Sequence, residues 1–372
     1  MIAKRKILFY THGLTGGGAE RVWALLASGF ARDGHDVIFA CDFEAGENRG
    51  FLDPAVRLVI LGGRHLRTVR RLASLIRKTQ PDVTFSAIGV SNLKHALAAA
   101  YVGRLSRAVQ SYHGYYESEP QLLSRLGYLA TPLTTRLFAR SICVSDGLFA
   151  YLKGRFWPDP RRTICVYNPV KWGENAARGD VPRAPVVLAA GRLVDYKNFP
   201  FLVRAFARVA TPGARLVILG EGPDRPTIEA EIARLGLAGR VTLAGYQNDP
   251  WPWYAQASCF ALASASEAFG LVVVEAMAYG LPVVATDCAG PRQILEDGRY
   301  GALIAQGDEA AMAAAIDHAL AEPGDAAARR RRALDFSVSV AVKRYAAVIE
   351  EIVAETGAPA IEAAPDRPRE AR

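Results

Sequence analysis

Short apolar runs alternate with stretches of helical spacing along almost the whole chain, and this alternation constrains the fold more than any other feature. Apolar residues recur at helical spacing between most of the runs, for example in residues 19–32, 66–79 and 91–103. Near-continuous apolar strands separated by helices form βαβ units, whose parallel sheet is covered on both faces. The predicted strands are residues 6–11, 36–40, 56–60, 82–87, 108–112, 141–145, 163–167, 185–191, 215–220, 240–245, 259–264 and 282–287. The pattern predicts an α/β fold.

A segment rich in proline, glycine and charge separates the first seven predicted strands from the last five. Residues 168–185, "NPVKWGENAARGDVPRAP", hold no apolar run and are typical of an interdomain linker. The 372 residues suffice for two doubly wound domains with a cleft between them, where the carboxyl ends of the strands bind ligands. The predicted parts are a first Rossmann-like domain (1–170), a linker (171–184), a second Rossmann-like domain (185–334), a helix that is a candidate to pack back on the first domain (335–355) and a disordered tail (356–372).

The composition is that of a globular protein in a reducing compartment. Hydrophobic residues make up 51% of the chain and charged residues 22%. The five cysteines include no Cys-x-x-Cys pair, which argues against a disulfide framework and a zinc site. No uncharged apolar run reaches the roughly 18 residues of a spanning helix, and the start "MIAKRKILFYT" is interpreted as a strand, not a signal peptide. We expect a cytoplasmic protein.

The segment of residues 264–287, "SASEAFGLVVVEAMAYGLPVVATD", carries the strongest functional signal. It predicts a helix over residues 271–279 that Gly280 ends. The residues before the helix would then offer free backbone N–H groups and a positive dipole end to a phosphate. Glu267 and Glu275 flank this helix start, and carboxylates accept hydrogen bonds from hydroxyls. A diphosphate at the helix start would place a sugar near one glutamate and a ribose near the other. The simpler alternative is that both glutamates are solvated charges on the surface.

The Glu-x7-Glu pattern in this segment resembles the signature of the retaining, two-domain glycosyltransferases of family 4, which have the GT-B fold. Four further blocks resemble the family in the expected order: "GGGAERVWALLASGFARDGHDV" (16–37), "YNPV" (167–170), "AAGRLVDYKNFPFLVRAF" (189–206) and "GEGPDRPTIEAEI" (220–232). The resemblance spans nearly the whole chain. It implies transfer of a sugar from a nucleoside diphosphate sugar to a glycan or polyprenyl-linked acceptor in the synthesis of cell-envelope polysaccharide or glycolipid, with UDP preferred over GDP as the nucleotide.

The resemblance also implies roles for individual residues. Arg192 and Lys197 would offset the charge of the leaving diphosphate, and His113 would contact the donor sugar without having to act as a base. The implied catalytic residues are Arg192, Lys197, Glu267 and His113, and the implied donor-binding residues are Gly16, Gly17, Gly18, Arg192, Lys197, Glu267, Phe269, Gly270, Leu271 and Glu275. The alternatives are that His113 is structural, that Gly16, Gly17 and Gly18 form only a tight turn, and that Arg192 and Lys197 are solvated loop cations.

The implied mechanism retains the anomeric configuration and needs no metal. The acceptor hydroxyl attacks the face that the diphosphate leaves, and a diphosphate oxygen takes its proton. No Asp-x-Asp motif occurs in the chain, so we expect neither a metal site nor a cofactor beyond the donor itself. One residue departs from the family: the segment "GPRQIL" has Gln293 where family members commonly have a glutamate.

Positive charge is concentrated in the first half of the chain. Residues 1–170 contain 23 Lys or Arg and 12 Asp or Glu, a net charge of +11, and the remainder has a net charge of −3. The basic helical stretch from Arg64 to Lys78 is a candidate contact with an anionic membrane surface, at the inner face of the cytoplasmic membrane. Its alternative is a solvated helix face, and nucleic acid is disfavoured because no binding motif accompanies the charge.

Two other functions fit the same fold, namely a nucleotide-sugar epimerase and a catalytically idle nucleotide-sugar-binding scaffold. The intact set of Arg192, Lys197, Glu267 and Glu275 argues against the scaffold. A dehydrogenase is disfavoured because the glycine triplet lacks the spacing of a dinucleotide-binding motif. Such an enzyme would also need an acidic residue after the second strand to bind a ribose, and Asp42 is the only candidate there. The sequence leaves open the nucleotide, the sugar, the acceptor with its linkage, and the oligomeric state.

Overall fold

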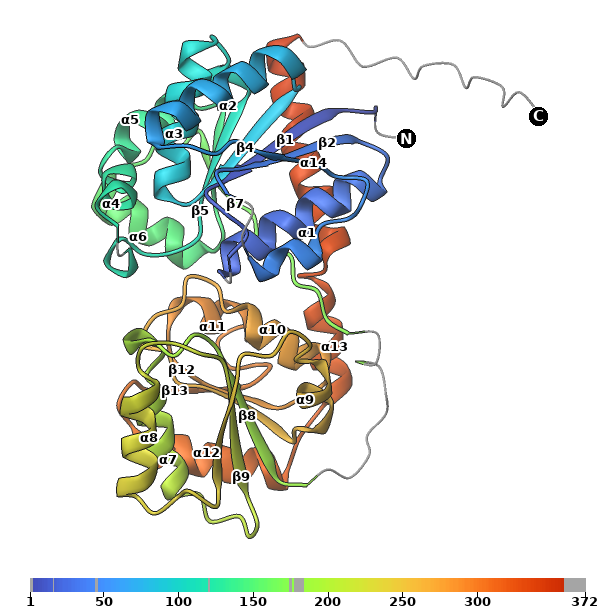
Figure 1. Cartoon of the computed structure of the whole chain (residues 1–372). Helices are drawn as coiled ribbons and strands as arrows, with labels where there is room; N and C mark the ends of the chain where they lie inside the picture. The colour runs from blue at the N-terminus through green and yellow to red at the C-terminus, as the bar shows by residue number, and fades with distance from the viewer. Residues whose placement is uncertain are drawn as a thin grey trace, which may run out of the picture.

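The computed structural model describes residues 3–15, 17–43, 46–119, 121–173, 176 and 184–357. These residues form two parallel sheets, each covered by helices on both faces (Figure 1). The prediction of two Rossmann-like α/β domains is confirmed. No helix in these ranges has the length and apolarity that a membrane span requires.

The sheet of the first domain has seven strands in the order β3-β2-β1-β4-β5-β6-β7, and all neighbours are parallel. The strand order reverses between β1 and β4, which places a switch point where Ile7 pairs with Val83. The strands are β1 (Lys6–Thr11), β2 (Asp36–Cys41), β3 (Arg57–Ile60), β4 (Val83–Ala87), β5 (Ala108–Tyr112), β6 (Arg140–Cys143) and β7 (Thr163–Cys165). The helices are α1 (Gly18–Arg32), α2 (His65–Thr79), α3 (Gly89–Tyr101), α4 (Leu122–Leu129), α5 (Thr131–Leu137) and α6 (Asp146–Phe156), with 3-10 turns at Glu47–Phe51, Leu105–Arg107 and Tyr116–Ser118.

The second domain repeats this topology with six strands in the order β10-β9-β8-β11-β12-β13. Its strands are β8 (Val186–Ala190), β9 (Arg215–Leu219), β10 (Val241–Gly245), β11 (Cys259–Leu262), β12 (Val283–Thr286) and β13 (Ala302–Ile304). Its helices are α7 (Phe199–Ala207), α8 (Arg225–Arg234), α9 (Trp251–Gln256), α10 (Leu271–Ala278), α11 (Ala289–Ile294), α12 (Glu309–Ala321) and α13 (Ala326–Leu334), and a 3-10 turn spans Asp195–Lys197. The sequence pattern did not predict β13, which has only three residues and a half-buried side.

The last helix, α14 (Val338–Thr356), belongs to the core of the first domain and crosses over from the second (Figure 1). Tyr345 packs edge-on against Trp23 of α1, with ring centroids 5.9 Å apart. A side chain at Gly29 would overlap Val342, so glycine is required where α1 and α14 cross. Glu350 accepts two hydrogen bonds from Arg5, at 2.9 and 2.6 Å. Much of the predicted linker (174, 175 and 177–183) and of the predicted tail (358–372) lies outside the described residues.

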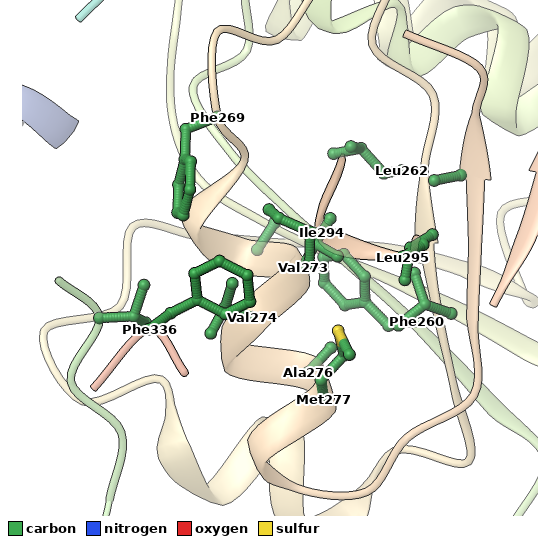
Figure 2. Close-up of a cluster of buried hydrophobic side chains, with 14 of the residues drawn as sticks. Phe260, Leu262, Phe269, Val273, Val274, Ala276, Met277, Ile294, Leu295 and Phe336 are labelled. Atoms are coloured by element: carbon green, nitrogen blue, oxygen red, sulfur yellow. The ribbon is translucent and has the colours of Figure 1, made fainter. Parts of the chain in front are cut away.

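A buried apolar cluster in the second domain holds α10 in place. Figure 2 shows Phe336 on one side of α10 and Phe260 of β11 on the other, with Val273 and Met277 between them. Phe269 precedes the helix and packs edge-on against Phe336, with centroids 5.6 Å apart. All five side chains are at most 3% exposed. The start of α10 is therefore fixed relative to the sheet.

Candidate functional site

The start of α10 lies where the two domains meet, and a glycine forms it. Gly270 has φ +101°, a left-handed conformation that side chains disfavour, and it is the residue that caps the helix. The preceding loop is held by Gly290 of α11, whose backbone N–H donates to the Glu267 carbonyl at 3.1 Å. A side chain at Gly290 would overlap the Phe269 carbonyl. The predicted segment from Phe269 to Leu271 therefore presents its backbone N–H groups at a rigid helix start.

Glu267 and Lys197 form an ion pair directly before this helix. Oε1 of Glu267 accepts from the Lys197 ammonium and from Ser264 Oγ, the latter at 2.9 Å. The Glu267 side chain is 10% exposed and that of Lys197 is 14% exposed. The pair thus places a positive charge, already oriented by a buried carboxylate, beside the N–H groups of α10.

Arg192 is an exposed cation close to Lys197 in the sequence. Its Nη2 donates to the Tyr196 hydroxyl at 2.9 Å, and the residue is exposed. Burial raises the pKa values of Glu20 and Glu119, both in the first domain, and the positive charge of Arg192 offsets part of that rise. Arg192 of the second domain therefore acts electrostatically on two carboxyls of the first domain.

Glu275 contacts the first domain instead of standing free. Its Oε1 accepts from Arg21 of α1, and its Oε2 accepts from the Tyr254 hydroxyl at 2.7 Å. The side chain of Glu275 is only 3% exposed. Each carboxylate oxygen has two lone pairs, so both can accept a further hydrogen bond from a ribose hydroxyl. Glu275 is therefore both a candidate ribose ligand and half of a bridge between the domains.

The sequence analysis did not single out Arg21, although it lies in the "GGGAER" block. The guanidinium lies 5.2 Å from the ring centroid of Phe51 in the first domain and 6.0 Å from that of Trp251 in the second. Trp251 stacks in turn on Tyr279, at 6.3 Å and 11°. Arg21 is thus held between aromatic rings of both domains while it pairs with Glu275.

Of the predicted glycine triplet, the structure describes Gly17 and Gly18, and Gly16 lies outside the described residues. A Cβ atom at Gly18 would lie 3.3 Å from Leu271 Cδ1, so the backbone of α1 approaches the start of α10 closely. A side chain at Gly17 would overlap the Glu20 carboxylate. A small residue at position 18 thus suits the close approach of the two domains, and the donor-binding role of this block stays a prediction.

His113 follows β5 and is held as a neutral imidazole. Burial lowers its pKa to about 3. Its Nε2 lies 2.7 Å from Ser111 Oγ, and this hydroxyl donates to the Ser86 carbonyl at 3.2 Å, so Nε2–H must be the donor of the pair. Nδ1 is then an unprotonated acceptor, buried and without a hydrogen-bond partner in the described part of the chain. A donor at Nδ1, such as a sugar hydroxyl, would complete the ring's hydrogen bonds.

Gln293, the departure from the family pattern, joins the two domains on another side of the site. Its Oε1 accepts from the Asp146 backbone N–H at 3.1 Å, and its Nε2 donates to the carboxylate of the same residue and to the Tyr167 hydroxyl, the latter at 2.6 Å. Tyr167 also donates to Asp146 at 3.1 Å. A glutamate at position 293 would face the Asp146 carboxylate, so the amide is explained by its partner.

Asp42, the alternative ribose binder, is occupied by protein side chains. Its carboxylate accepts from Tyr10 at 2.9 Å and lies 2.5 Å from both His12 Nδ1 and Lys94 Nζ. Burial alone would raise the pKa of Asp42, but the hydrogen bonds from His12 and Lys94 outweigh it and lower the pKa. The one described carboxylate at this strand end is therefore already bound by protein side chains, which disfavours the dinucleotide interpretation.

Comparison with known proteins decides the family. The family described as "Glycosyltransferase Family 4" matches residues 16–171, and "Glycosyl transferases group 1" matches residues 184–322. The chain is 30% identical over 315 residues to the lipopolysaccharide core biosynthesis glycosyltransferase LpsE of Rhizobium meliloti, covering 82% of this chain and 86% of the relative. The chain belongs to glycosyltransferase family 4. The predicted resemblance is confirmed for this family 4 glycosyltransferase, and neither the epimerase nor the idle scaffold is favoured.

Solved structures agree on the fold of this family 4 glycosyltransferase. A glycosyltransferase from Rickettsia africae superposes with a TM-score of 0.79 at 18% identity, covering 94% of this chain and 99% of that one. HepE of Anabaena, in complex with UDP and glucose, superposes with a TM-score of 0.72 at 21% identity, covering 95% and 99%. The two domains therefore have the GT-B arrangement that the sequence predicted. The roles of single residues stay predictions.

Proposed function

We propose that this glycosyltransferase moves a sugar from a UDP-linked donor to a hydroxyl of a glycan or polyprenyl-linked acceptor during the synthesis of lipopolysaccharide or a related envelope glycan. The name of the Rhizobium meliloti relative, a lipopolysaccharide core enzyme, supports the acceptor class. The complex of HepE with UDP and glucose supports UDP over GDP. We place the reaction at the cytoplasmic side of the membrane, with the enzyme attached peripherally.

The Lys197–Glu267 pair beside the start of α10 is the observation that carries this proposal. Backbone N–H groups at a helix start bind a diphosphate, and Lys197 and Arg192 supply the positive charge that its departure requires. Glu267 fixes the Lys197 ammonium, and Ser264 donates to Glu267 at 2.9 Å. The charges are in place before the donor arrives, so little reorganisation is needed when the bond breaks.

In the proposed reaction the bond between the anomeric carbon and the diphosphate breaks, and its electron pair stays on the diphosphate. The acceptor hydroxyl attacks the same face of the sugar, and its proton passes to a diphosphate oxygen, so configuration is retained. His113, neutral and with a free Nδ1 lone pair, would accept a hydrogen bond from a sugar hydroxyl and orient the ring. No metal enters this scheme, because Lys197 and Arg192 carry the positive charge.

The binding of the nucleotide would use Glu275 for the ribose. Its oxygens already accept from Arg21 and Tyr254, and each retains a lone pair for a ribose hydroxyl. Arg21 would then remain bound while the ribose enters, and it would tie the first domain to the bound nucleotide.

Product analysis tests the reaction directly. Purified enzyme is given UDP-sugars with a lipopolysaccharide core acceptor, in buffer with EDTA, and the anomeric configuration of the product is read by NMR. A product with the donor's configuration, formed at the same rate with and without EDTA, supports the proposal. An inverted product contradicts retention, and activity that EDTA abolishes and Mn²⁺ restores contradicts metal independence.

A further inference from the structure

Helices α4 and α5 turn their leucines away from the protein. Ala130 alone separates the two helices, and its helical φ and ψ keep them nearly continuous. Five of the six leucines of these helices, all except Leu123, recur at intervals of four, three, four and four residues, so they share one face. They are Leu122, Leu126, Leu129, Leu133 and Leu137, with exposed fractions of 73, 42, 57, 61 and 44%. We call this set the leucine stripe.

The inward face of the same helices is small and polar, which fixes the stripe outward. The buried residues of this face are Ser124, Gly127, Tyr128, Thr131, Thr134 and Thr135. A side chain at Gly127 of α4 would overlap the Gly89 carbonyl of α3, so α4 and α3 are in backbone contact. Thr131 accepts from Tyr112 at 3.1 Å and Thr134 from Gln110 at 3.1 Å. A rotation that buried the leucines would break these contacts.

The surface around the stripe is strongly positive. Residues 64–140, which contain α2 to α5, include twelve Lys or Arg and three Asp or Glu, a net charge of +9. These four helices lie along one side of the first domain (Figure 1). Residues 121–145 contain no acidic residue, while Arg125 and Arg136 are exposed on the stripe helices themselves. A large apolar surface with a basic surround is complementary to an anionic bilayer.

A hollow of about 240 Å³ opens at the junction of α4 and α5. Leu129 and Pro132 line it on one side, and Phe156 and Trp157 line it on the other. Trp157 is 70% exposed, and Arg155 is the one charged residue of the lining. An apolar hollow with a tryptophan and an arginine at its rim suits the boundary between lipid headgroups and acyl chains.

The structure changes the expectation for α2. Its apolar side chains Leu72, Ala73 and Ile76 are buried against the sheet of the first domain. Only Leu66 of this helix is a large exposed apolar residue, at 75%. The arginines of α2 can attract an anionic surface, but this helix has almost nothing to insert.

We propose that the leucine stripe inserts into the surface of an anionic bilayer, with the arginines of α2 adding electrostatic attraction. This inference deepens the proposed function, because it says how the enzyme would reach a lipid-anchored acceptor. Its occupant is lipid and not a second copy of the chain. Eight Lys or Arg among the described residues of 64–140 are exposed, against one Asp or Glu, and such a positive surface would repel its own copy.

Vesicle co-sedimentation of the full chain tests the stripe. Vesicles of phosphatidylcholine alone and of phosphatidylcholine with phosphatidylglycerol are compared for wild type and a Leu126→Gln/Leu129→Gln/Leu133→Gln variant. The matched control is Leu334→Gln in the second domain, where the leucine is 55% exposed. We expect the triple variant to partition about 100-fold less into anionic vesicles, since each leucine loses a large part of its transfer free energy, and the control to partition like wild type. An Arg67→Gln/Arg70→Gln variant should weaken partitioning at low salt only.

Two outcomes would overturn the proposal that the leucine stripe inserts into a bilayer. One is equal sedimentation of wild type and the triple variant with anionic vesicles. The other is a wild-type dimer in size-exclusion chromatography that the triple variant converts to a monomer, which would make the stripe a self-interface. UDP binding is also measured for wild type and the triple variant, so that failure of the membrane proposal can be distinguished from failure of the proposed function. If wild type sediments with vesicles but binds no nucleotide, only the proposed function is contradicted.

Discussion

The contact between Gln293 and Asp146 allows a sharp test of how the two domains hold together. Replacing Gln293 with glutamate, the residue common in the family, changes little in volume but adds a carboxylate where Nε2 donates to Asp146. Two unit charges about 4 Å apart repel by about 1 kcal/mol in water and about 4 kcal/mol at an effective dielectric constant of 20. Because Asp146 is exposed and Gln293 half-buried, we expect a cost near the lower figure, about 1–2 kcal/mol.

The assay is a double-mutant cycle. Gln293→Glu should lower kcat/KM for the sugar transfer about 5- to 30-fold, because the contact that joins the two domains at this position is weakened. Asp146→Asn in the same chain should restore most of the loss, since an amide then faces the new carboxylate. The repulsion raises the carboxyl pKa values above those of the unfolded chain, so the loss is present at pH 7 and fades as the pH falls through the raised values. Equal losses for Gln293→Glu with and without Asp146→Asn would show that repulsion from Asp146 is not the cause.

Three further predictions concern single residues of the site. Arg21→Ala leaves Glu275 buried with only Tyr254 as its partner, so we expect the free energy of unfolding, measured with urea, to fall by about 2–4 kcal/mol. Arg21→Lys keeps a positive charge and should lose little stability. Equal stability of wild type and both variants would contradict this. Gly270→Ala forces a side chain into φ +101°, which should cost about 1–3 kcal/mol in the same assay, whereas Gly114→Ala, at a glycine with open space around its Cβ position, should cost less than half as much. His113 has a folded-state pKa of about 3 and an unfolded value near 6.5, so its contribution to stability is complete above pH 6.5 and is lost as the pH falls toward 3. A His113→Asn variant should lose this part of the acid dependence of unfolding. An unchanged pH profile of stability in the variant would contradict this prediction.

Much of the fold could be predicted from the sequence because buried parallel strands have a local signature. The predicted strand ends differ from the observed ones by no more than two residues, and α10 begins at Leu271 as expected. Strand β13 was missed because three residues, two of them half-buried, are too few to form a recognisable pattern.

The site was only partly predictable, because its residues meet across two domains. Glu267, Lys197 and Gly270 lie in one domain within recognisable blocks, and the structure brings them together as expected. The pairing of Arg21 with Glu275 depends on how the domains are placed, which no local pattern encodes. The outward direction of the leucine stripe is also hidden, since leucines at helical spacing ordinarily mark a buried face.

We propose that a nucleoside diphosphate binds at the start of α10 through the charge of Lys197. Isothermal titration of UDP, GDP and ADP into wild type, Lys197→Gln and Lys153→Gln measures the contribution of this charge. Glutamine at position 197 keeps a hydrogen bond to Glu267 but removes the charge, and Lys153 is an exposed lysine on α6 of the first domain. We predict that UDP binds wild type and Lys153→Gln equally and binds Lys197→Gln at least 10-fold more weakly, a loss of about 1.4 kcal/mol or more. Equal affinity of all three proteins for UDP, or no binding of any nucleotide to wild type, would contradict the account.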